Sequence, residues 1–472
     1  MLTKEGSNKM LRKQQNGWLK TDEQKKKDIF EFAEGYKRFL NIAKTEREFV
    51  NETMKVVEAQ GFINAEKLDS LKIGDKIYYL NRGKNIVLVV VGKEEIEKGV
   101  NFIVSHADVP RLDLKGNPLY EDTELAMMKT HYYGGIKKYQ WVSIPLALHG
   151  VVILENGDKV DISIGEDEND PVFTIPDILP HLARKVQGER KAGEVIKGEE
   201  LNVLIGSIPS TIEDKEIKEK VKYAVLEKLN EKYGMVEEDF ISAELQIVPA
   251  FKAKDVGLDR AIVGAYGHDD RVCGFTSLKA IIDLDEVPNR TSICYIVDKE
   301  EIGSTGSTGL ESNYIEFVLS DMINRIKGEY NEIDLKKCLW NSKAISADVS
   351  DALNPMFKEV HDSLNVAKLG QGIVVTKYTG SGGKYSTNDA DAEFVFEIRK
   401  LFNERKISWQ IGMLGKVDEG GGGTVAKYLA HFGIKTIDAG PALLAMHSPF
   451  ELASKLDIYE TYKAYKSFFK YI

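Results

Sequence analysis

Cysteine is scarce in this sequence of 472 residues, and the three that occur, Cys273, Cys294 and Cys338, lie far apart. No C-x-x-C pair is present, which argues against a disulfide framework and against a cysteine-based zinc site. A chain that uses so little cysteine is typical of a reducing compartment. We therefore expect a cytoplasmic protein.

Long apolar runs and an excess of positive charge are also missing. No segment approaches the roughly 20 apolar residues that span a bilayer, and the basic N-terminus, MLTKEGSNKMLRKQQNGWLK, lacks the uninterrupted apolar stretch of a signal peptide. Lys and Arg number 64 against 74 Asp and Glu, so the formal net charge is −10. This balance argues against binding to phosphate backbones. We expect neither a membrane nor a nucleic-acid partner.

The first organised region is helical. Hydrophobic residues make up 43% of the chain, which at this length is enough for more than one domain. Capping-box spacing occurs at Thr21 with Gln24 and at Thr45 with Glu48. Apolar residues then recur at helical period until Gly61. These patterns predict two amphipathic helices at the start of the protein.

Short β-forming runs follow these helices. The runs at residues 85–92 and 101–105 are rich in β-branched residues and almost continuously apolar, as in strands that are covered on both faces. Similar runs recur at residues 291–297, 408–413 and 434–438, with helical segments such as residues 271–282 between the strand-forming parts. We expect an α/β fold with a mixed sheet sandwiched by helices.

The region between the two strand-rich parts has a different character. It holds a hairpin pattern that turns at Asn156-Gly157 and a charged helical stretch, DKEIKEKVKYAVLEKLNEKYG. We interpret residues 110–248 as an inserted second domain. The catalytic domain would then be formed by residues 1–109 and 249–472.

Residues capable of chemistry come just after the predicted strands. They are His106 with Asp108, Glu300 with Glu301, Asp348, and His447, and Asp269 with Asp270 lies in a turn that opens a helix. Each motif alone has a simpler reading as a polar turn, a helix cap or a solvent-facing pair. In an α/β sheet, however, the carboxyl ends of the strands meet in one crevice. Together these side chains form a mixed nitrogen and oxygen set that suits two divalent metals bridged by one carboxylate and one water.

Such a set is suited to hydrolysis at neutral pH. Two cations about 3.5 to 4 Å apart lower the pKa of a shared water, while a nearby carboxylate takes its proton. Glu300 and Glu301 could divide the roles of base and ligand. Asp108 could accept the second N–H of His106 and hold its tautomer.

These motifs resemble those of the aspartyl aminopeptidase (M18) family of di-metal metallo-aminopeptidases. The matching segments are SHADVPRLD, YYGGI, GHDDR, EEIGS, SADVSDALNP, GKYSTND and AMHSPFE, and they run in order from about Val104 to Glu451. The resemblance implies the phosphorylase/hydrolase-like zinc peptidase fold. It also implies that the insert is a β-rich dimerisation domain and that dimers assemble into tetrahedral dodecamers.

The resemblance assigns a role to each matched residue. Asp269 would bridge both metals, His106 and Asp348 would complete one shell, Glu301 and His447 the other, Glu300 would be the general base, and Asp108 would stand behind His106. Zinc is the expected metal, with cobalt and manganese as alternatives. The implied activity is removal of N-terminal residues from peptides with a free N-terminus.

One departure from the family leaves the preferred N-terminal residue of the substrate undecided. Acidic-selective members carry a lysine ahead of the segment that GKYSTND resembles, and this chain has Gly382 near that place, although Lys384 is close and could substitute. His131, in the stretch THYYGGI, could reach a neighbouring subunit's site. A related di-metal carboxypeptidase or amidohydrolase, and a non-catalytic scaffold, remain alternative interpretations.

Overall fold

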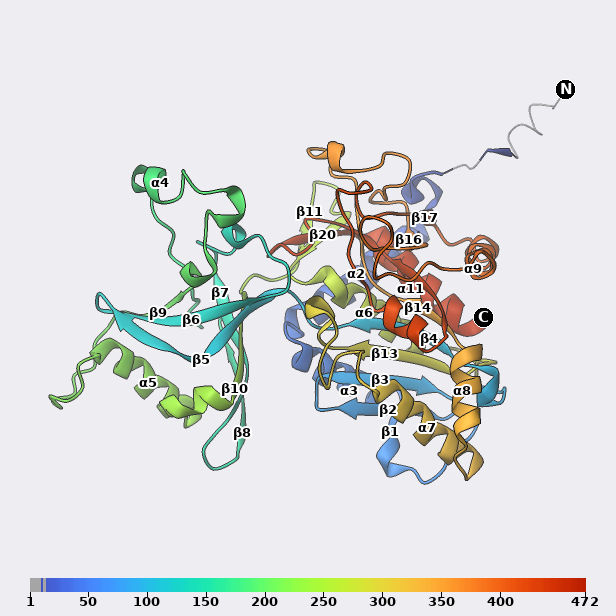
Figure 1. Cartoon of the computed structure of the whole chain (residues 1–472), viewed down its shortest axis with the longest axis horizontal. Coiled ribbons are helices and arrows are strands. Elements are labelled where there is room, and N and C mark those ends of the chain that lie inside the picture. Colours follow the sequence, from blue (N-terminus) through green and yellow to red (C-terminus); the bar gives the residue numbers. More distant parts are fainter. Residues whose placement is uncertain (1–9, 12–13) are drawn as a thin grey trace.

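The computed structural model describes residues 10, 11 and 14–472, which form a large α/β body and a smaller β-rich unit at its side (Figure 1). The large body is built on a nine-stranded sheet. From one edge to the other the strands are β1 (Ile63–Asn64), β2 (Lys76–Asn81), β3 (Asn85–Val90), β13 (Ser292–Val297), β4 (Asn101–His106), β14 (Lys343–Ser346), β18 (Lys435–Gly440), β16 (Ile373–Thr376) and β17 (Trp409–Ile411). The central four, β13, β4, β14 and β18, run parallel, so their carboxyl ends share one edge.

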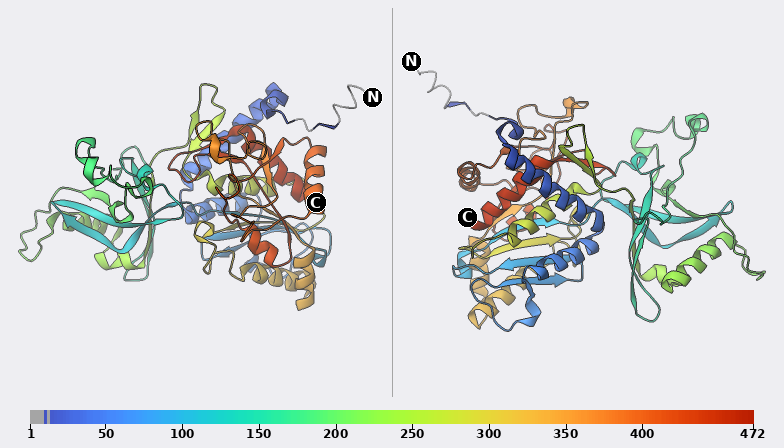
Figure 2. Two further views of the ribbon diagram at one scale, coloured as in Figure 1. Left: turned by 45° about the horizontal axis from the view of Figure 1, so that its top comes forward. Right: turned by 180° about the vertical axis from the view of Figure 1, so that it is seen from behind.

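Helices cover both faces of this sheet. One face packs against α2 (Glu23–Ile42), α3 (Glu46–Ala59), α6 (His268–Ile282), α9 (Ala392–Glu404) and α11 (Lys455–Tyr471). The other face packs against α7 (Tyr314–Lys327), α8 (Glu332–Asn341) and α10 (Ala426–His431). Figure 2 shows α2 and α11 lying across the first face. Alternate side chains of β3 enter the two cores: Leu88 joins the first, whereas Val87 and Val89 join the second.

The expected mixed α/β architecture is therefore confirmed. The predicted cap of α3 is also confirmed, because Thr45 and Glu48 form a complete capping box. The predicted cap of α2 is wrong: Asp22, not Thr21, accepts the main-chain N–H of Lys25. A carboxylate is the stronger acceptor at a helix N-terminus, and it also meets the helix dipole favourably.

A separate β unit, residues 111–249, contains a six-stranded sheet. Its strands in spatial order are β8 (Lys159–Ile164), β7 (Leu146–Ile153), β10 (Ala243–Pro249), β5 (Arg111–Asp122), β6 (Leu125–Tyr133) and β9 (Val203–Gly206). Helices α4 (Pro180–Val186) and α5 (Lys220–Tyr233) accompany the sheet. The unit has a hydrophobic core of its own, which includes the fully buried Trp141. The predicted hairpin is present as β7 and β8, which pair antiparallel.

Charged groups join the β unit to the large body. His149 on β7 is buried, and its ring nitrogens lie 2.7 Å from Glu48 of α3 and 3.1 Å from Glu166. Lys44 also reaches Glu166, at 2.5 Å. Burial opposes a charge on this histidine, but its two carboxylate partners raise the pKa of His149 above its usual value.

A third, five-stranded sheet lies beside the site described below. Its strands are β11 (Lys254–Val256), β12 (Ile262–Ala265), β20 (Glu451–Ser454), β19 (Ala442–Leu444) and β15 (Ser350–Asp351). Within the described part of the chain, none of the helices is long and apolar enough to cross a membrane.

Arg271 anchors the first turn of α6. Its side chain is completely buried and donates hydrogen bonds to the main-chain carbonyls of Gly267 at 3.0 Å, Tyr266 at 2.7 Å and Ala43. These carbonyls belong to the loop before α6 and to the link between α2 and α3. Arg271 thereby fixes the segment that carries Asp269 and Asp270.

We predict that Arg271→Met lowers the free energy of unfolding by about 3 kcal/mol, because three buried carbonyls lose a charged donor. Arg260→Met is the matched control: the Arg260 side chain is 70% exposed and pairs with Asp255, so its loss should cost less than about 1 kcal/mol. Urea denaturation of the metal-free proteins measures both. Equal losses in the two variants would contradict the anchoring role.

Candidate metal centre

The sequence-predicted residues meet at the shared edge of the parallel strands. His106 is the last residue of β4, Glu300 and Glu301 follow β13, and Asp348 follows β14. These three strands are neighbours in the sheet (Figure 1). Their carboxyl ends therefore bring the side chains together. Asp269, in the first turn of α6, and His447, beyond β19, complete the group.

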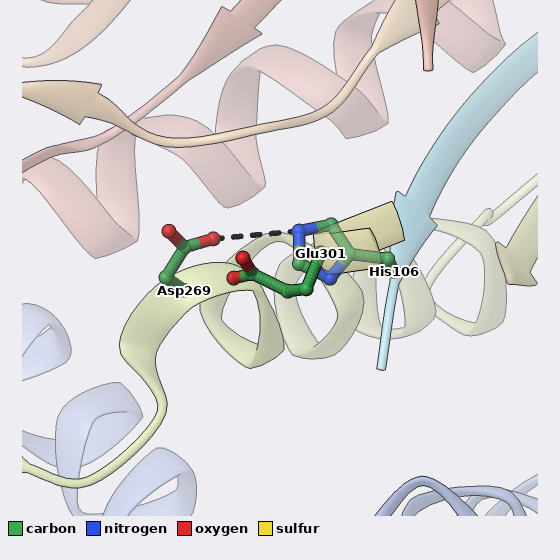
Figure 3. A group of neighbouring side chains, drawn as sticks. All are labelled: His106, Asp269 and Glu301. Atoms are coloured by element: carbon green, nitrogen blue, oxygen red, sulfur yellow. Dashed lines mark ion pairs between the residues drawn. The ribbon is translucent and has the colours of Figure 1, made fainter. Parts of the chain in front are cut away.

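Asp269 lies between two histidines. Its Oδ1 is 3.4 Å from Nε2 of His106, and its Oδ2 is 3.0 Å from Nε2 of His447. Glu301 lies next to Asp269 and His106 (Figure 3), and its Oε1 is 3.5 Å from Nε2 of His447. Burial alone would raise the pKa of Asp269, but the two neighbouring histidines lower it well below its usual range. The carboxylate is therefore ionised, with one oxygen turned toward each histidine.

Two overlapping groups of donor atoms could each hold a cation. In both groups the donor atoms lie within 4.8 Å of one another, and the members are His106, Asp269 and Glu301 in the first and His106, Asp270 and Asp348 in the second. Several of these atoms are buried without a hydrogen-bond partner among the described residues: Nε2 of His106, Oδ1 of Asp269, Oδ1 of Asp270 and Oε1 of Glu301. Buried polar atoms without partners are costly. Imidazole nitrogen and carboxylate oxygen are ligands that suit zinc and related divalent metals, so the residues fit such ions.

The histidine rings are oriented from behind by main-chain carbonyls. Nδ1 of His106 lies 2.9 Å from the carbonyl oxygen of Asp108, and Nδ1 of His447 lies 2.8 Å from that of Gly135 in the β unit. Each Nδ1–H can donate to its carbonyl, which leaves Nε2 free to act as a ligand. The Asp108 carboxylate lies farther from His106, with Oδ1 3.4 Å from Nδ1.

The Asp108 carboxylate instead organises the turn after β13. It accepts the main-chain N–H groups of Glu300 at 3.1 Å and Glu301 at 3.2 Å. The hydroxyl of Tyr133, on β6, also donates to it at 2.8 Å. Asp108 therefore connects the His106 strand, the Glu300–Glu301 turn and the β unit.

Glu451 plays a similar part on the other side of the centre. Its two oxygens accept the main-chain N–H of Asp269 at 3.1 Å and that of His447 at 2.6 Å. His447 has a φ of 64°, so this contact helps to hold a backbone conformation that is unusual for a residue other than glycine. The sequence interpretation gave no role to Glu451 or Asp270. The acid next to Asp269 and the acid that closes AMHSPFE were the only signals for them.

The electrostatics of the cluster favour bound positive charge. Burial raises the pKa of Glu300 to about 7, and burial with the nearby Asp269 carboxylate raises the pKa values of Glu301 and Asp348 well above their usual range. Burial opposes charge on His447, yet the carboxylates raise its pKa to about 11. Without bound metal, these carboxylates and the histidine therefore hold protons, and divalent cations would displace them.

The centre opens into a cavity of about 430 Å³. Its lining includes the cluster residues Asp269, Glu300, Glu301, Asp348 and His447 together with Thr376, Leu414, Gly421, Gly422, Gly423, Thr424, Lys427, Tyr428 and Asp438. The cavity thus places the proposed chemistry beside space for a small substrate.

Two other residues singled out by the sequence lie outside this cavity. Lys384 pairs with Asp389 at 2.7 Å, and its ammonium lies 3.8 Å from the ring centroid of Tyr378. His131 is exposed on β6, and its Nδ1 contacts the carbonyl of Tyr132 at 2.9 Å. Neither residue lines the cavity that holds the cluster.

Comparison with known proteins gives a consistent result over almost the whole chain. The family described as Aminopeptidase I zinc metalloprotease (M18) matches residues 39–469. A probable M18 family aminopeptidase 1 of Borreliella afzelii is 57% identical over 459 residues, covering 97% of this chain and 100% of the relative. The corresponding protein of Clostridium acetobutylicum is 49% identical over 465 residues, covering 98% of this chain and 99% of the relative.

Solved structures agree with these relatives. The crystal structure of the M18 family aminopeptidase from Thermotoga maritima has a TM-score of 0.93 at 45% identity, with 98% of this chain and all of that chain covered. The mApe1 dodecamer of S. cerevisiae has a TM-score of 0.75 at 20% identity, covering 93% of this chain and 96% of that one. At that identity the likeness concerns the fold.

We predict that Glu451→Gln weakens zinc binding by about 10- to 100-fold, because an amide can no longer accept both N–H groups that hold Asp269 and His447. Competition with a chromophoric chelator measures the affinity, and circular dichroism checks that the variant is folded. Glu332→Gln, on the exposed side of α8, is the control and should bind zinc as the wild type does. Wild-type zinc affinity in the folded Glu451 variant would refute this positioning role.

Proposed function

The chain belongs to the M18 family of metallo-aminopeptidases, and from that membership we propose that its buried histidine–carboxylate cluster holds two divalent cations beside a general base. The proposed ligands are His106, Asp269, Glu301, Asp348 and His447, and the proposed base is Glu300. Zinc, which the family description names, is the proposed metal, with cobalt and manganese as alternatives.

The observation that carries this proposal is the position of Asp269. Its two oxygens face two different histidines, as expected for a carboxylate that bridges two cations. Asp348 belongs to the group around His106, and Glu301 approaches His447. Asp270, which shares the group of His106 and Asp348, is a further candidate oxygen donor.

Bound cations of this kind supply a water of lowered pKa and offset the negative charge that develops on the scissile carbonyl oxygen. Glu300 lines the cavity, with Oε2 3.8 Å from Nε2 of His106. Its carboxylate takes a proton from the attacking water and passes it to the leaving amine. Burial supports this role because it raises the pKa of Glu300 to about 7. Near neutral pH the carboxylate can therefore both accept and release a proton.

The cavity suits a substrate with a positively charged end. Asp348 and Asp438 line it with three other acidic residues, and a carboxylate-rich lining favours the α-ammonium group of a free N-terminus. An acetylated N-terminus carries no such charge. The proposed substrates are accordingly peptides with a free N-terminus, processed from that end.

The proposed assembly is a homo-oligomer. We assign residues 110–248 as the dimerisation domain and residues 1–109 with 249–472 as the catalytic domain, with dimers forming a tetrahedral dodecamer. The separate core of the β unit and its exposed Leu182, Ile208 and Ile241 support this assignment, as does the dodecameric relative. The proposed compartment is the cytoplasm, which agrees with three buried, free cysteines.

We predict that metal removal abolishes hydrolysis and that zinc, cobalt or manganese restores it. The substrates are a panel of free peptides and their N-acetylated counterparts, and mass spectrometry identifies the residues released. Stepwise release from the N-terminus should occur only with free peptides and only with metal. Release from the C-terminus, or from acetylated peptides, would instead support a carboxypeptidase or amidohydrolase.

Two variants separate the base from the bridge. Glu300→Gln should keep its metal while turnover falls by about 10²- to 10⁴-fold, because the amide cannot accept the proton. Asp269→Asn should lose metal, because an amide cannot offer an anionic oxygen to both sides. Elemental analysis and peptide assays on the same preparations measure the two effects. Full activity in either variant would overturn the role assigned to that residue.

A further inference from the structure

Lys427 lines the same cavity as the cluster. It is the only lysine or arginine among the described residues that line the cavity. Five acidic residues line the same space: Asp269, Glu300, Glu301, Asp348 and Asp438. A single cationic side chain in so acidic a cavity is expected to find a carboxylate partner.

Lys427 has no such partner within the described part of the chain. No carboxylate oxygen lies within 4.0 Å of its ammonium group, which instead sits 4.6 Å from the ring centroid of Tyr428. Asp438 lines the cavity too, but its Oδ1 accepts the hydroxyl of Thr424 at 2.6 Å and its Oδ2 is buried without a hydrogen-bond partner among the described residues. The ammonium group therefore remains available to a ligand, held over an aromatic face.

The fold holds this ammonium at a defined place relative to the cluster. Lys427 and Tyr428 lie in α10, directly after the glycine-rich loop of residues 420–423. The Tyr428 hydroxyl donates to the carbonyl of Gly303 at 2.6 Å, and Gly303 ends the turn that carries Glu300 and Glu301. One hydrogen bond thus ties the helix of Lys427 to the turn of the proposed base.

We propose that Lys427 binds a carboxylate of the substrate and makes the enzyme selective for peptides that place one there. This inference rests on the proposed function, since Asp269, Glu301 and Asp348 are engaged as ligands and Glu300 as base. A substrate carboxylate then supplies the counter-charge that the described residues do not. It comes either from an acidic N-terminal side chain or from the free C-terminus of a dipeptide.

Lys384, the lysine that the sequence suggested for this task, is already neutralised. It pairs with Asp389 and lines a different, smaller cavity next to Tyr378. Lys384→Gln is therefore a matched control, a lysine of the same region that is replaced in the same way.

The test compares kcat/KM on matched peptides for the zinc-loaded wild type, Lys427→Gln, Lys427→Arg and Lys384→Gln. One pair is a tripeptide amide that begins with Asp or with Asn. The other is Ala-Ala with a free or an amidated C-terminus. We expect Lys427→Gln to reduce the preference for the carboxylate member of one pair at least tenfold, mainly through KM. Lys427→Arg should retain most of that preference, and Lys384→Gln should stay within about twofold of the wild type.

Each outcome has one meaning. Loss of the Asp preference identifies the N-terminal side chain as the source of the carboxylate, whereas loss of the free-carboxylate preference in Ala-Ala identifies the C-terminus. If the wild type prefers neither carboxylate, or if Lys427→Gln changes both members of each pair equally, the inference is wrong. If the wild type releases no residue from any of the free peptides, it is the proposed function that fails.

Discussion

The carboxylate of Asp269, held between two histidines, is the contact on which the rest of the centre depends. Its oxygens must stay directed at His106 and His447, which come from segments more than 300 residues apart in the chain. Much of the surrounding structure serves this requirement. Arg271 fixes the loop before α6, and Glu451 accepts the main-chain N–H groups of both Asp269 and His447.

This arrangement collects negative charge where water is scarce. Buried carboxylates that lie close together repel one another, and bound protons or cations relieve this repulsion. The raised pKa values of Glu301 and Asp348 show that these carboxylates bind protons when no cation is present. The metal expected of the family would neutralise them with divalent cations instead. The same electrostatic argument makes the ammonium of Lys427 informative, because it pairs with no carboxylate of the described residues although five acidic residues line the same cavity.

Local patterns in the sequence predicted the architecture well. The apolar runs that became β3, β4 and β13 are continuous because helices cover both faces of the sheet, and a capping box marks the start of α3. The motifs after these strands identified the residues that meet at the sheet edge. Long-range hydrogen bonds could not be foreseen in this way. The contact of Glu451 with Asp269 joins residues 182 positions apart, and no spacing rule describes it.

Contacts made by charged side chains explain the other differences between the predicted and the observed structure. In the sequence, Lys384 is near enough to replace the missing lysine, but in the structure it forms an ion pair with Asp389. Lys427 belongs to no motif, so its place in the cavity of the cluster follows only from the contact between α10 and the turn after β13. The cap of α2 moved by one residue for a similar reason, since the Asp22 carboxylate is a better acceptor than the Thr21 hydroxyl.

The hydrogen bond from His447 to the carbonyl of Gly135 limits how freely the β unit could be exchanged for another domain. The β unit is continuous in sequence and has its own core, so it resembles a module that could be exchanged between proteins. Yet one of its carbonyls orients a proposed ligand, and its Tyr133 hydroxyl binds Asp108. Recombination that replaced the unit would also have to preserve these two contacts. The two parts of the chain are thus constrained to be inherited together.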